Sequence, residues 1–356
     1  MAVSREIITR ILEAGVKAPS GSNSQPWRFR VRGDDVFVVA LPEKDHRILN
    51  YRNRGTLVAH GALLENITIA AAGLEHQVEI ELFPDKAEPA VWARIHISKS
   101  DKDLPDADLY PYIPQRTTNR KPYKPDPLTP AQKADLLAAT IVVPGADVKF
   151  IEERVSIEVL AKASSANEIV MLENRDLHKL FFEEIVWSAE AEKKRGGGLY
   201  VKTMELKPPE QFALKNFFKY WPVMNFANKL GLAKMIAKNN AKTYAAAGAW
   251  GAIFVRDADN DFLTAGRVIE RIWIKAAQLG LSLHLISGVL FLRQRIKAGL
   301  TAGFSSEHIE LVNQAYDSIA RVTDVKDNKL VGLLFRIGVG GEPSARSYKP
   351  PPDMGG

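Results

Sequence analysis

The sequence contains no cysteine among its 356 residues. This absence excludes disulfides, cysteine nucleophiles and cysteine-ligated metals, and it gives no reason to expect an oxidising compartment. Redox chemistry would therefore have to come from a cofactor. The seven histidines have no spacing typical of a metal site, so we predict no metal.

Long apolar runs are also missing. No window approaches the roughly 18 to 20 uncharged apolar residues that would span a bilayer. The first segment carries charges at Arg5, Glu6, Arg10 and Glu13, unlike a secretion signal. We therefore expect a cytoplasmic protein without stable membrane insertion. The G-x-G-x-x-G string of dinucleotide-binding folds and the G-x-S-x-G string of hydrolases are absent as well.

The net charge of +6 is compatible with nucleic acid, an anionic membrane or a phosphate-bearing small molecule. Many lysines fall between Lys193 and Lys242, among several aromatic residues. This pattern is typical of an amphipathic membrane-surface segment or of a lid. The plainer alternative, which we favour, is that the lysines are solvated and the aromatic residues face the core. We expect no nucleic-acid partner.

An internal repeat relates two parts of the chain at a constant offset of 205 residues. Each copy is predicted to form a helix with small residues on one face, preceded by one apolar strand and followed by two more. The strands are expected at 36–41, 78–82 and 91–97 in the first copy and at 251–255, 283–287 and 332–339 in the second. The matched helix positions are Gly61, Glu65, Ile67, Ile69, Ala71 and Ala72 against Gly266, Glu270, Ile272, Ile274, Ala276 and Ala277.

The repeat divides the chain into halves at 1–110 and 111–356, joined by a proline-rich connector. Arg116, Arg120 and Lys121 in this connector, together with neighbouring hydroxyl groups, are suited to holding a phosphate, because guanidinium groups bind phosphate bidentately. The alternative is a solvated charged linker.

The loop APSGSNSQPWRF, Ala18 to Phe29, is rich in turn formers and hydrogen-bonding groups. Its small residues would let the backbone approach a ligand closely. Together with the pattern R-x-T-x-R at Arg116, Thr118 and Arg120, this loop resembles the flavin-dependent nitroreductase superfamily.

The order of these two motifs is reversed relative to ordinary family members, which are homodimers with FMN at the subunit interface. The resemblance therefore implies a fused pseudo-dimer, most similar to the Acg-like subgroup. The implied fold class is α+β, a nitroreductase-like fold in which two internally duplicated halves with mainly antiparallel sheets are flanked by helices. A fused dimer would have two equivalent flavin sites. The residues that would form the second site lack both the arginine motif and the serine-asparagine loop, so we expect one FMN per chain.

The resemblance also implies which residues bind the cofactor. A backbone group of the turn Ile286 to Gly288 would face the flavin, although Ser287 stands where the family has glutamate. Either Arg346 or Lys349 would bind the phosphate, and the sequence leaves the choice open. The full predicted set is Pro19, Ser20, Gly21, Asn23, Gln25, Arg116, Thr118, Arg120, Ser287, Gly288, Arg346 and Lys349. We assign no catalytic side chain.

The implied activity is an FMN-dependent oxidoreductase that passes a hydride through flavin N5 to a small electrophile such as a nitroaromatic, a quinone or an activated alkene. NAD(P)H would be the electron donor. The alternative is a protein that binds and sequesters FMN without turnover. Residues 155–245 are expected to form a helical insertion or lid with a glycine hinge at Gly196 to Gly198. His284 and Glu270 are expected near the flavin face, with His284 more simply a core or surface residue. Further association of the pseudo-dimer stays open.

Overall fold

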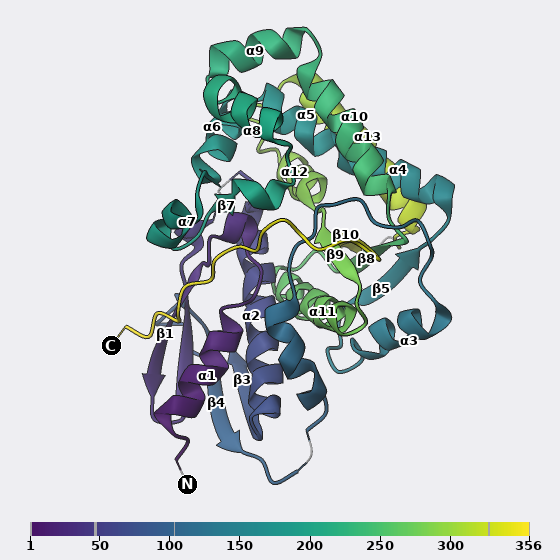
Figure 1. Cartoon of the computed structure of the whole chain (residues 1–356). Coiled ribbons are helices and arrows are strands. Elements are labelled where there is room, and N and C mark those ends of the chain that lie inside the picture. The colour runs from purple at the N-terminus through teal and green to yellow at the C-terminus, as the bar shows by residue number, and fades with distance from the viewer. Residues whose placement is uncertain (1, 46–47, 103, 327, 356) are drawn as a thin grey trace.

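A computed structural model describes residues 2–45, 48–102, 104–326 and 328–355. Two four-stranded antiparallel sheets are covered by helices (Figure 1). The expected α+β class with mainly antiparallel sheets is confirmed, since the one parallel pair among the named strands is the two-residue pair β6 (Ile185–Val186) and β7 (Leu199–Tyr200).

The first sheet has the order β1-β2-β4-β3 and follows helix α1 (Arg5–Gly15), which Ser4 caps. Burial alternates along its edge strand β3, as expected for a sheet with one face on the core and one open to solvent. Its strands are β1 (Trp27–Arg32), β2 (Asp35–Ala40), β3 (His76–Leu82) and β4 (Val91–Lys99).

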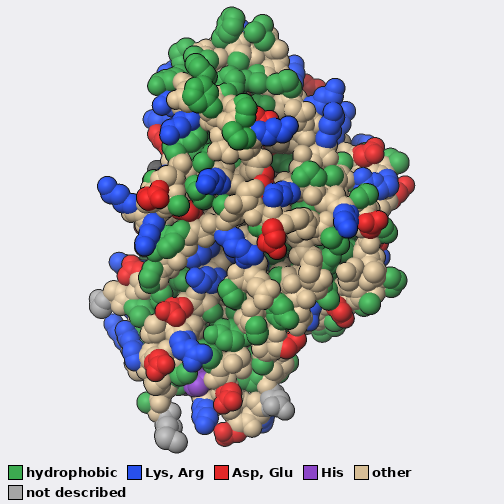
Figure 2. Space-filling model, in the orientation of Figure 1, with side chains coloured by type: hydrophobic (Ala, Val, Ile, Leu, Met, Phe, Trp, Pro, Cys, Tyr) green, Lys and Arg blue, Asp and Glu red, His purple; other side chains and the backbone are tan. Residues whose placement is uncertain are grey.

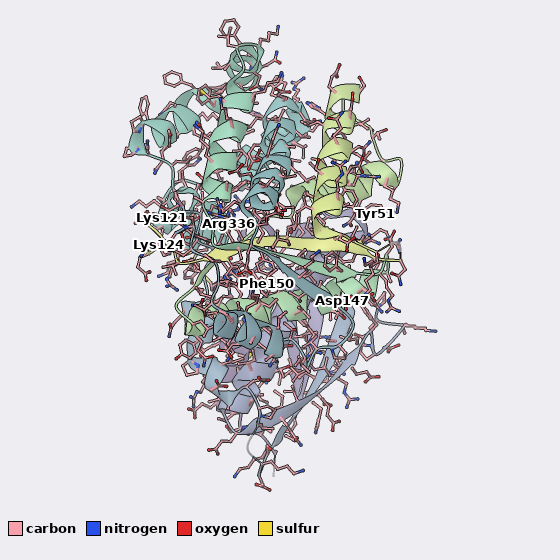
Figure 3. All side chains as sticks on the ribbon, turned by 90° about the vertical axis from the view of Figure 1, so that its right-hand side faces the viewer. Tyr51, Lys121, Lys124, Asp147, Phe150 and Arg336 are labelled. Carbon is pink, nitrogen blue, oxygen red and sulfur yellow. The ribbon has the colours of Figure 1, made fainter. Side chains whose placement is uncertain are left out.

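The second sheet has the order β5-β8-β10-β9. Every residue of β8 is buried, because helices cover both faces of this sheet. Figure 3 shows Arg336 and Phe150 on opposite faces of it. Its strands are β5 (Asp147–Ile151), β8 (Ala249–Val255), β9 (Ser282–Leu285) and β10 (Leu330–Gly338), and α3 (Pro130–Ala138) precedes β5.

The two helices of the repeat pack against each other at the centre of the molecule. Helix α2 (Arg54–Gly73) and helix α11 (Asp259–Gln278) have bounds that differ by 205 residues at both ends. A Cβ atom on Gly61 would lie 2.0 Å from the backbone oxygen of Leu263, and one on Gly266 would lie 2.1 Å from that of Val58. Glycine at both equivalent positions is what allows this close crossing.

A helical cap, residues 154–245, lies at the top of the molecule in Figure 1. Its own small core is formed by Leu172, Met224 and Ala233, separate from the main clusters. The helices of the cap are α4 (Arg154–Ser164), α5 (Ala166–Glu173), α6 (Arg175–Glu184), α7 (Ala189–Arg195), α8 (Pro208–Ala213), α9 (Trp221–Lys229) and α10 (Leu232–Ala245).

The remaining helices are α12 (Gly288–Lys297) and α13 (Ser306–Thr323), which lie beside the cap. After β10 the chain runs as an irregular arm across the front of the molecule to β1, where the N–H of Phe29 donates to the carbonyl of Asp353 over 2.8 Å (Figure 1). This C-terminal arm, residues 339–355, brings the end of the described chain onto the first sheet.

Candidate functional site

The loop between α1 and β1 has a tightly wound backbone. Ser22, Asn23 and Gln25 all have positive φ values, of 44°, 59° and 48°. The hydroxyl of Ser20 accepts a hydrogen bond from the N–H of Gln25 over 2.9 Å and so closes the turn. Asn23 and Gln25 are buried, which means that the polar groups of the loop are directed into the molecule.

The glycine run Gly196 to Gly198 packs directly on this loop. All three glycines have positive φ values, and a Cβ atom on Gly197 would lie 2.3 Å from the backbone oxygen of Asn23. The amide of Gln25 donates to the carbonyl of Gly196 over 3.4 Å. The run is therefore a close contact between cap and loop; its predicted role as a hinge stays a prediction.

The R-x-T-x-R stretch, which lies before α3 in the chain, enters the same region. Its three residues occupy every second position of an irregular segment, in which Thr118 forms a parallel bridge with Leu283 at the edge of the second sheet. Arg116 donates to the carbonyl of Lys17 over 2.8 Å, and Arg120 donates to that of Thr203 over 3.0 Å. The two arginines thus connect the loop to the cap.

Arg116 is almost fully buried against helix α11. Its Nε atom lies 3.1 Å from Glu270 Oε1, and its guanidinium carbon lies 4.7 Å from the centre of the Trp273 ring. Burial raises the pKa of Glu270 to about 7, although Arg116 opposes this rise. Within the described part of the chain, Arg116 Nε and both Glu270 oxygens lack a hydrogen-bond partner.

Lys349, on the C-terminal arm, is a further cation in the same region as Arg116 and Arg120. Its ammonium group donates to the carbonyl of Ala18 and to Asn23 Oδ1, each over 2.7 Å. Burial, with the nearby charge of Arg116, lowers the pKa of Lys349 to about 7. Arg346 is exposed and donates to the carbonyls of Pro114 and Gln115.

Two adjoining cavities lie between these elements. The first, which we call the cationic cavity, has a volume of about 220 Å³, and Lys17, Arg116, Arg120, Arg346 and Lys349 contribute to its wall. Figure 2 shows Lys and Arg side chains gathered near the middle of this face. The second, the apolar cavity, has a volume of about 310 Å³. Both share Pro19, Ser20, Ser22, Thr118 and Arg120, so they adjoin along these residues.

Aliphatic and aromatic side chains form most of the apolar cavity. Trp273 and Ile269 come from α11, and Phe291 comes from α12. Asp45 and Glu184 are the carboxylates in its wall. Burial raises the pKa of each, and the hydroxyls of Ser24 and Ser22 donate to Asp45 and Glu184, respectively. Two neighbouring carboxyl groups with raised pKa values can hold protons beside a bound molecule.

The turn before α12 presents its backbone to the apolar cavity. Gly288 is in the cavity wall, and the first N–H groups of a helix have no partner within the helix. A Cβ atom on Gly288 would lie 2.3 Å from Asn167 Oδ1, so a larger residue would not fit. The Ser287 side chain does not reach the cavity, because its hydroxyl donates to the carbonyl of Leu334 and accepts from the Leu334 N–H.

The structure brings ten of the twelve predicted site residues to the two cavities, while Gln25 and Ser287 support them from outside. His284 lies in neither wall. It is buried beside Arg336 and Tyr244, and burial lowers its pKa well below the usual value. His284 is therefore a core residue, as the simpler interpretation expected. Sequence reasoning missed Asp45, Glu184, Trp273 and Phe291, since none belongs to a recognisable motif.

The repeat places a buried arginine at one of its matched helix positions. Arg271 is buried, and its guanidinium lies 2.5 Å from both Glu65 Oε1 and Asp106 Oδ2 while it donates to the carbonyl of Ala139. By the 205-residue offset, Arg271 corresponds to Asn66, a shorter side chain whose amide donates to the carbonyl of Ala14 over 3.3 Å. The repeat thus has a buried arginine in α11 at the position where α2 has the shorter asparagine.

Across the described ranges, no helix is long and apolar enough to cross a membrane. In those same ranges, no group of three or more His, Asp or Glu residues is arranged to hold a metal ion.

Comparison with known proteins relates the chain to nitroreductases. Residues 1–38 match the model of the Nitroreductase family. The chain is 26% identical over 287 residues to "Uncharacterized protein MT1398" of Mycobacterium tuberculosis, which is 80% of this chain and 39% of the relative. It is 31% identical over 134 residues to "Putative NAD(P)H nitroreductase Rv3131" of the same organism, which is 38% of this chain and 39% of the relative. The matches thus span about two fifths of the length of these curated relatives.

Solved structures that match part of the chain include a nitroreductase with bound FMN from Bacteroides fragilis, at 10% identity and a TM-score of 0.34 over 68% of this chain and 94% of that chain. The FMN-dependent nitroreductase NfnB from Mycobacterium smegmatis, in complex with NADPH, matches at 10% identity and a TM-score of 0.35 over 65% and 87% of the two chains. The family-model match includes the loop Ala18 to Phe29 but stops before Arg116 and the C-terminal arm.

Proposed function

We propose that the whole chain is an FMN-dependent oxidoreductase of the Nitroreductase family, in which two fused halves enclose one cofactor. The observation that carries this proposal is the adjoining pair of cavities, one cationic and one apolar, to which the N-terminal loop, the Arg116 to Arg120 stretch and the C-terminal arm all contribute. The name of the relative at 31% identity supports NAD(P)H as the electron donor.

The duplication, with halves at 1–110 and 111–356, is supported by the sheets as well as by the repeat. In both sheets the second strand in chain order pairs with the first and the fourth, and the third strand is at the far edge. Helices α2 and α11 occupy equivalent positions, and Gly61 and Gly266 face each other's backbones at the crossing. These correspondences are expected of two copies related by an approximate two-fold axis.

The residues of the two cavities fit FMN. A phosphate group suits the cationic cavity, whose wall contains Arg116, Arg120 and Lys349, and the Lys349 ammonium has a third N–H available. A flat aromatic ring suits the apolar cavity, between Trp273 and Phe291. Together the cavities fall within the range of roughly 300–1,000 Å³ that is typical of cofactor sites.

Bound FMN would supply hydride transfer from NAD(P)H to a small electrophile such as a nitroaromatic, a quinone or an activated alkene. The protein's part is to hold the ring against Trp273 and Phe291 and to direct the Gly288 N–H into the apolar cavity. Asp45 and Glu184 would keep protons at their carboxyl oxygens for delivery to the acceptor.

Residues 155–245 would act as the lid of this site. Glu184 reaches the apolar cavity from the cap, and Gly198 and Thr203 reach the cationic cavity. These contacts would exclude water from the reacting groups. Limited proteolysis with and without FMN tests the lid, because a lid closed over FMN should be cut more slowly near Gly196.

The first experiment is the absorption spectrum of the purified protein, followed by quantitation of the flavin released on denaturation. We expect one FMN per chain, since Arg271 fills the equivalent position in the other half. Two flavins per chain, or none after incubation with excess FMN, would contradict the proposal. Rapid reduction by NADH or NADPH distinguishes the oxidoreductase from a protein that only sequesters FMN, whose flavin would be reduced by dithionite alone.

A further inference from the structure

The tip of the helical cap, residues 208–245, has a surface unlike the rest of the molecule. Six large apolar side chains on it are more than half exposed, with exposed fractions of 51% for Phe217 to 75% for Leu230. Figure 2 shows hydrophobic side chains gathered at the top of the molecule, over α8 and α9. The six residues are Phe212, Phe217, Tyr220, Phe226, Leu230 and Met235.

This exposure corrects the interpretation that the aromatic residues of the segment face the core. The core beneath the tip takes in Met224 and Ala233, with Phe218 only partly buried. The exposed rings instead contact one another, as in the edge-to-face pair of Phe212 and Phe217 at 5.9 Å. A monomeric protein in water gains nothing from a contiguous exposed patch of this kind, which normally marks an interaction surface.

After Glu210, near its start, the tip carries charge of a single sign. No aspartate or glutamate occurs between Glu210 and Asp257. Six lysines occur in the same interval, all of them exposed, and within the described structure none has a carboxylate partner within 4.0 Å. They are Lys215, Lys219, Lys229, Lys234, Lys238 and Lys242.

We propose that the tip of the cap, residues 208–245, binds the surface of an anionic lipid membrane. Its exposed aromatic and aliphatic side chains would enter the interface between headgroups and acyl chains, and its lysines would bind lipid phosphates. A second copy of the chain is a poorer occupant, because it would bring six more unpaired lysines against the first six. Binding of this kind is peripheral and needs no spanning helix.

Membrane binding is independent of the proposed flavin chemistry, because the tip residues line neither cavity. Co-sedimentation of the full chain with phosphatidylcholine vesicles, with and without phosphatidylglycerol, tests it directly. We expect binding only to vesicles that contain phosphatidylglycerol, and we expect added salt to weaken it. Failure to bind these vesicles at low salt would overturn the proposal.

A variant in which four of the lysines are replaced, together with a matched control, tests the role of the lysines. At about fivefold per lysine, neutralising four of them should weaken vesicle binding by on the order of 100-fold or more. The control removes four exposed lysines elsewhere and should change binding less than about threefold, so an equal loss in the control would overturn the proposal. The variant is Lys215→Gln, Lys219→Gln, Lys229→Gln and Lys234→Gln, and the control is Lys44→Gln, Lys86→Gln, Lys124→Gln and Lys162→Gln.

The apolar side chains are tested by Phe226→Ser with Leu230→Ser, against Ile141→Ser with Val155→Ser as control. The control residues are 77% and 67% exposed but lie outside the tip. Only the first pair should reduce vesicle binding, by more than tenfold, with unchanged circular dichroism. A concentration-dependent dimer that Phe226→Ser abolishes, without vesicle binding by the unmodified chain, would assign the tip to self-association and overturn the lipid proposal.

Discussion

Replacing Lys349 by methionine should separate recognition of the phosphate from recognition of the flavin ring. The Lys349 ammonium uses two of its three N–H groups on Ala18 and Asn23, both in the N-terminal loop. Its third donor is free to bind a ligand in the cationic cavity, whose wall Lys349 shares with Arg116. Methionine keeps the length of the side chain and removes only the donors and the charge.

The expected loss follows from one charge-assisted hydrogen bond, about 1.5–3 kcal/mol, or roughly 10- to 150-fold in the Kd for FMN. Riboflavin has no phosphate, so its affinity should change less than about threefold. Titrations of flavin fluorescence with each ligand measure both values. Equal losses for FMN and riboflavin would refute the assignment, because they would mean that Lys349 only holds the loop in shape.

The pH dependence of FMN binding gives a second measurement on the same residue. The pKa of Lys349 in the flavin-free protein is lowered to about 7, so above this pH the free site has lost its proton and must regain it to bind a phosphate. The phosphate of FMN is already dianionic there, with a second pKa of about 6. The Kd for FMN should therefore rise by up to about tenfold per pH unit above pH 7, and Lys349→Met should remove this slope.

Arg346→Met is the matched control, and it answers the question that the sequence left open. Arg346 is in the wall of the cationic cavity but is exposed, and its donors already serve Pro114 and Gln115. A solvated cation contributes less than a buried one, so Arg346→Met should weaken FMN binding less than Lys349→Met. The reverse order would assign the phosphate to Arg346.

Three further predictions concern the framework around the site. Gly61→Leu should lower the free energy of unfolding by about 2 kcal/mol or more by overpacking the helix crossing, with Gly341→Ala, where a Cβ meets nothing within 4 Å, as a neutral control in urea denaturation. Burial raises the pKa of Glu270 from 4.5 to about 7 in the folded chain, so between these pH values the folded chain binds a proton that the unfolded chain has lost. The free energy of unfolding should therefore fall as pH rises from 4.5 to about 7. Glu270→Gln should flatten this part of the stability profile, and an unchanged profile would contradict the assignment. Ser287→Ala removes two hydrogen bonds to Leu334 and should cost about 1–3 kcal/mol in the same denaturation assay, whereas a flavin contact of the hydroxyl would leave the stability of the flavin-free chain unchanged.

Much of the architecture could be predicted because strands and helices follow from the pattern of apolar residues over a few neighbouring positions. The six strands expected around the repeat are present as β2, β3, β4, β8, β9 and β10, since runs such as 251–255 have the apolar character of buried strands. The repeat predicted helices α2 and α11, each with a face of small residues that lets another helix pack closely. Two helices can cross this closely only where small residues face each other, and Gly61 and Gly266 are those residues. The seven helices of the cap have no counterpart in the first half, so the repeat carried no information about them.

The site could be predicted in part for a similar reason. The loop residues and Arg116 to Arg120 belong to local motifs whose composition indicates a ligand. Asp45 and Glu184 do not, because only the folded chain brings α6 of the cap over the loop and places both carboxyl groups on one cavity. The proposed preference for Lys349 over Arg346 also depends on burial, which the local sequence of an irregular arm does not reveal.

The asymmetry between the two halves has a physical cause in one pair of equivalent residues. Glu65 and Glu270 occupy the same place in their helices, and both are fully buried. Glu65 is neutralised from within its own helix pair, by Arg267 and Arg271, which fill the adjoining space. Glu270 has Asn66 beside it in place of an arginine, so its counter-charge must come from Arg116, which lies in the wall of the cationic cavity. Under the proposed duplication, arginine at position 271 and asparagine at position 66 would therefore close one site and leave the other with a cation facing its ligand.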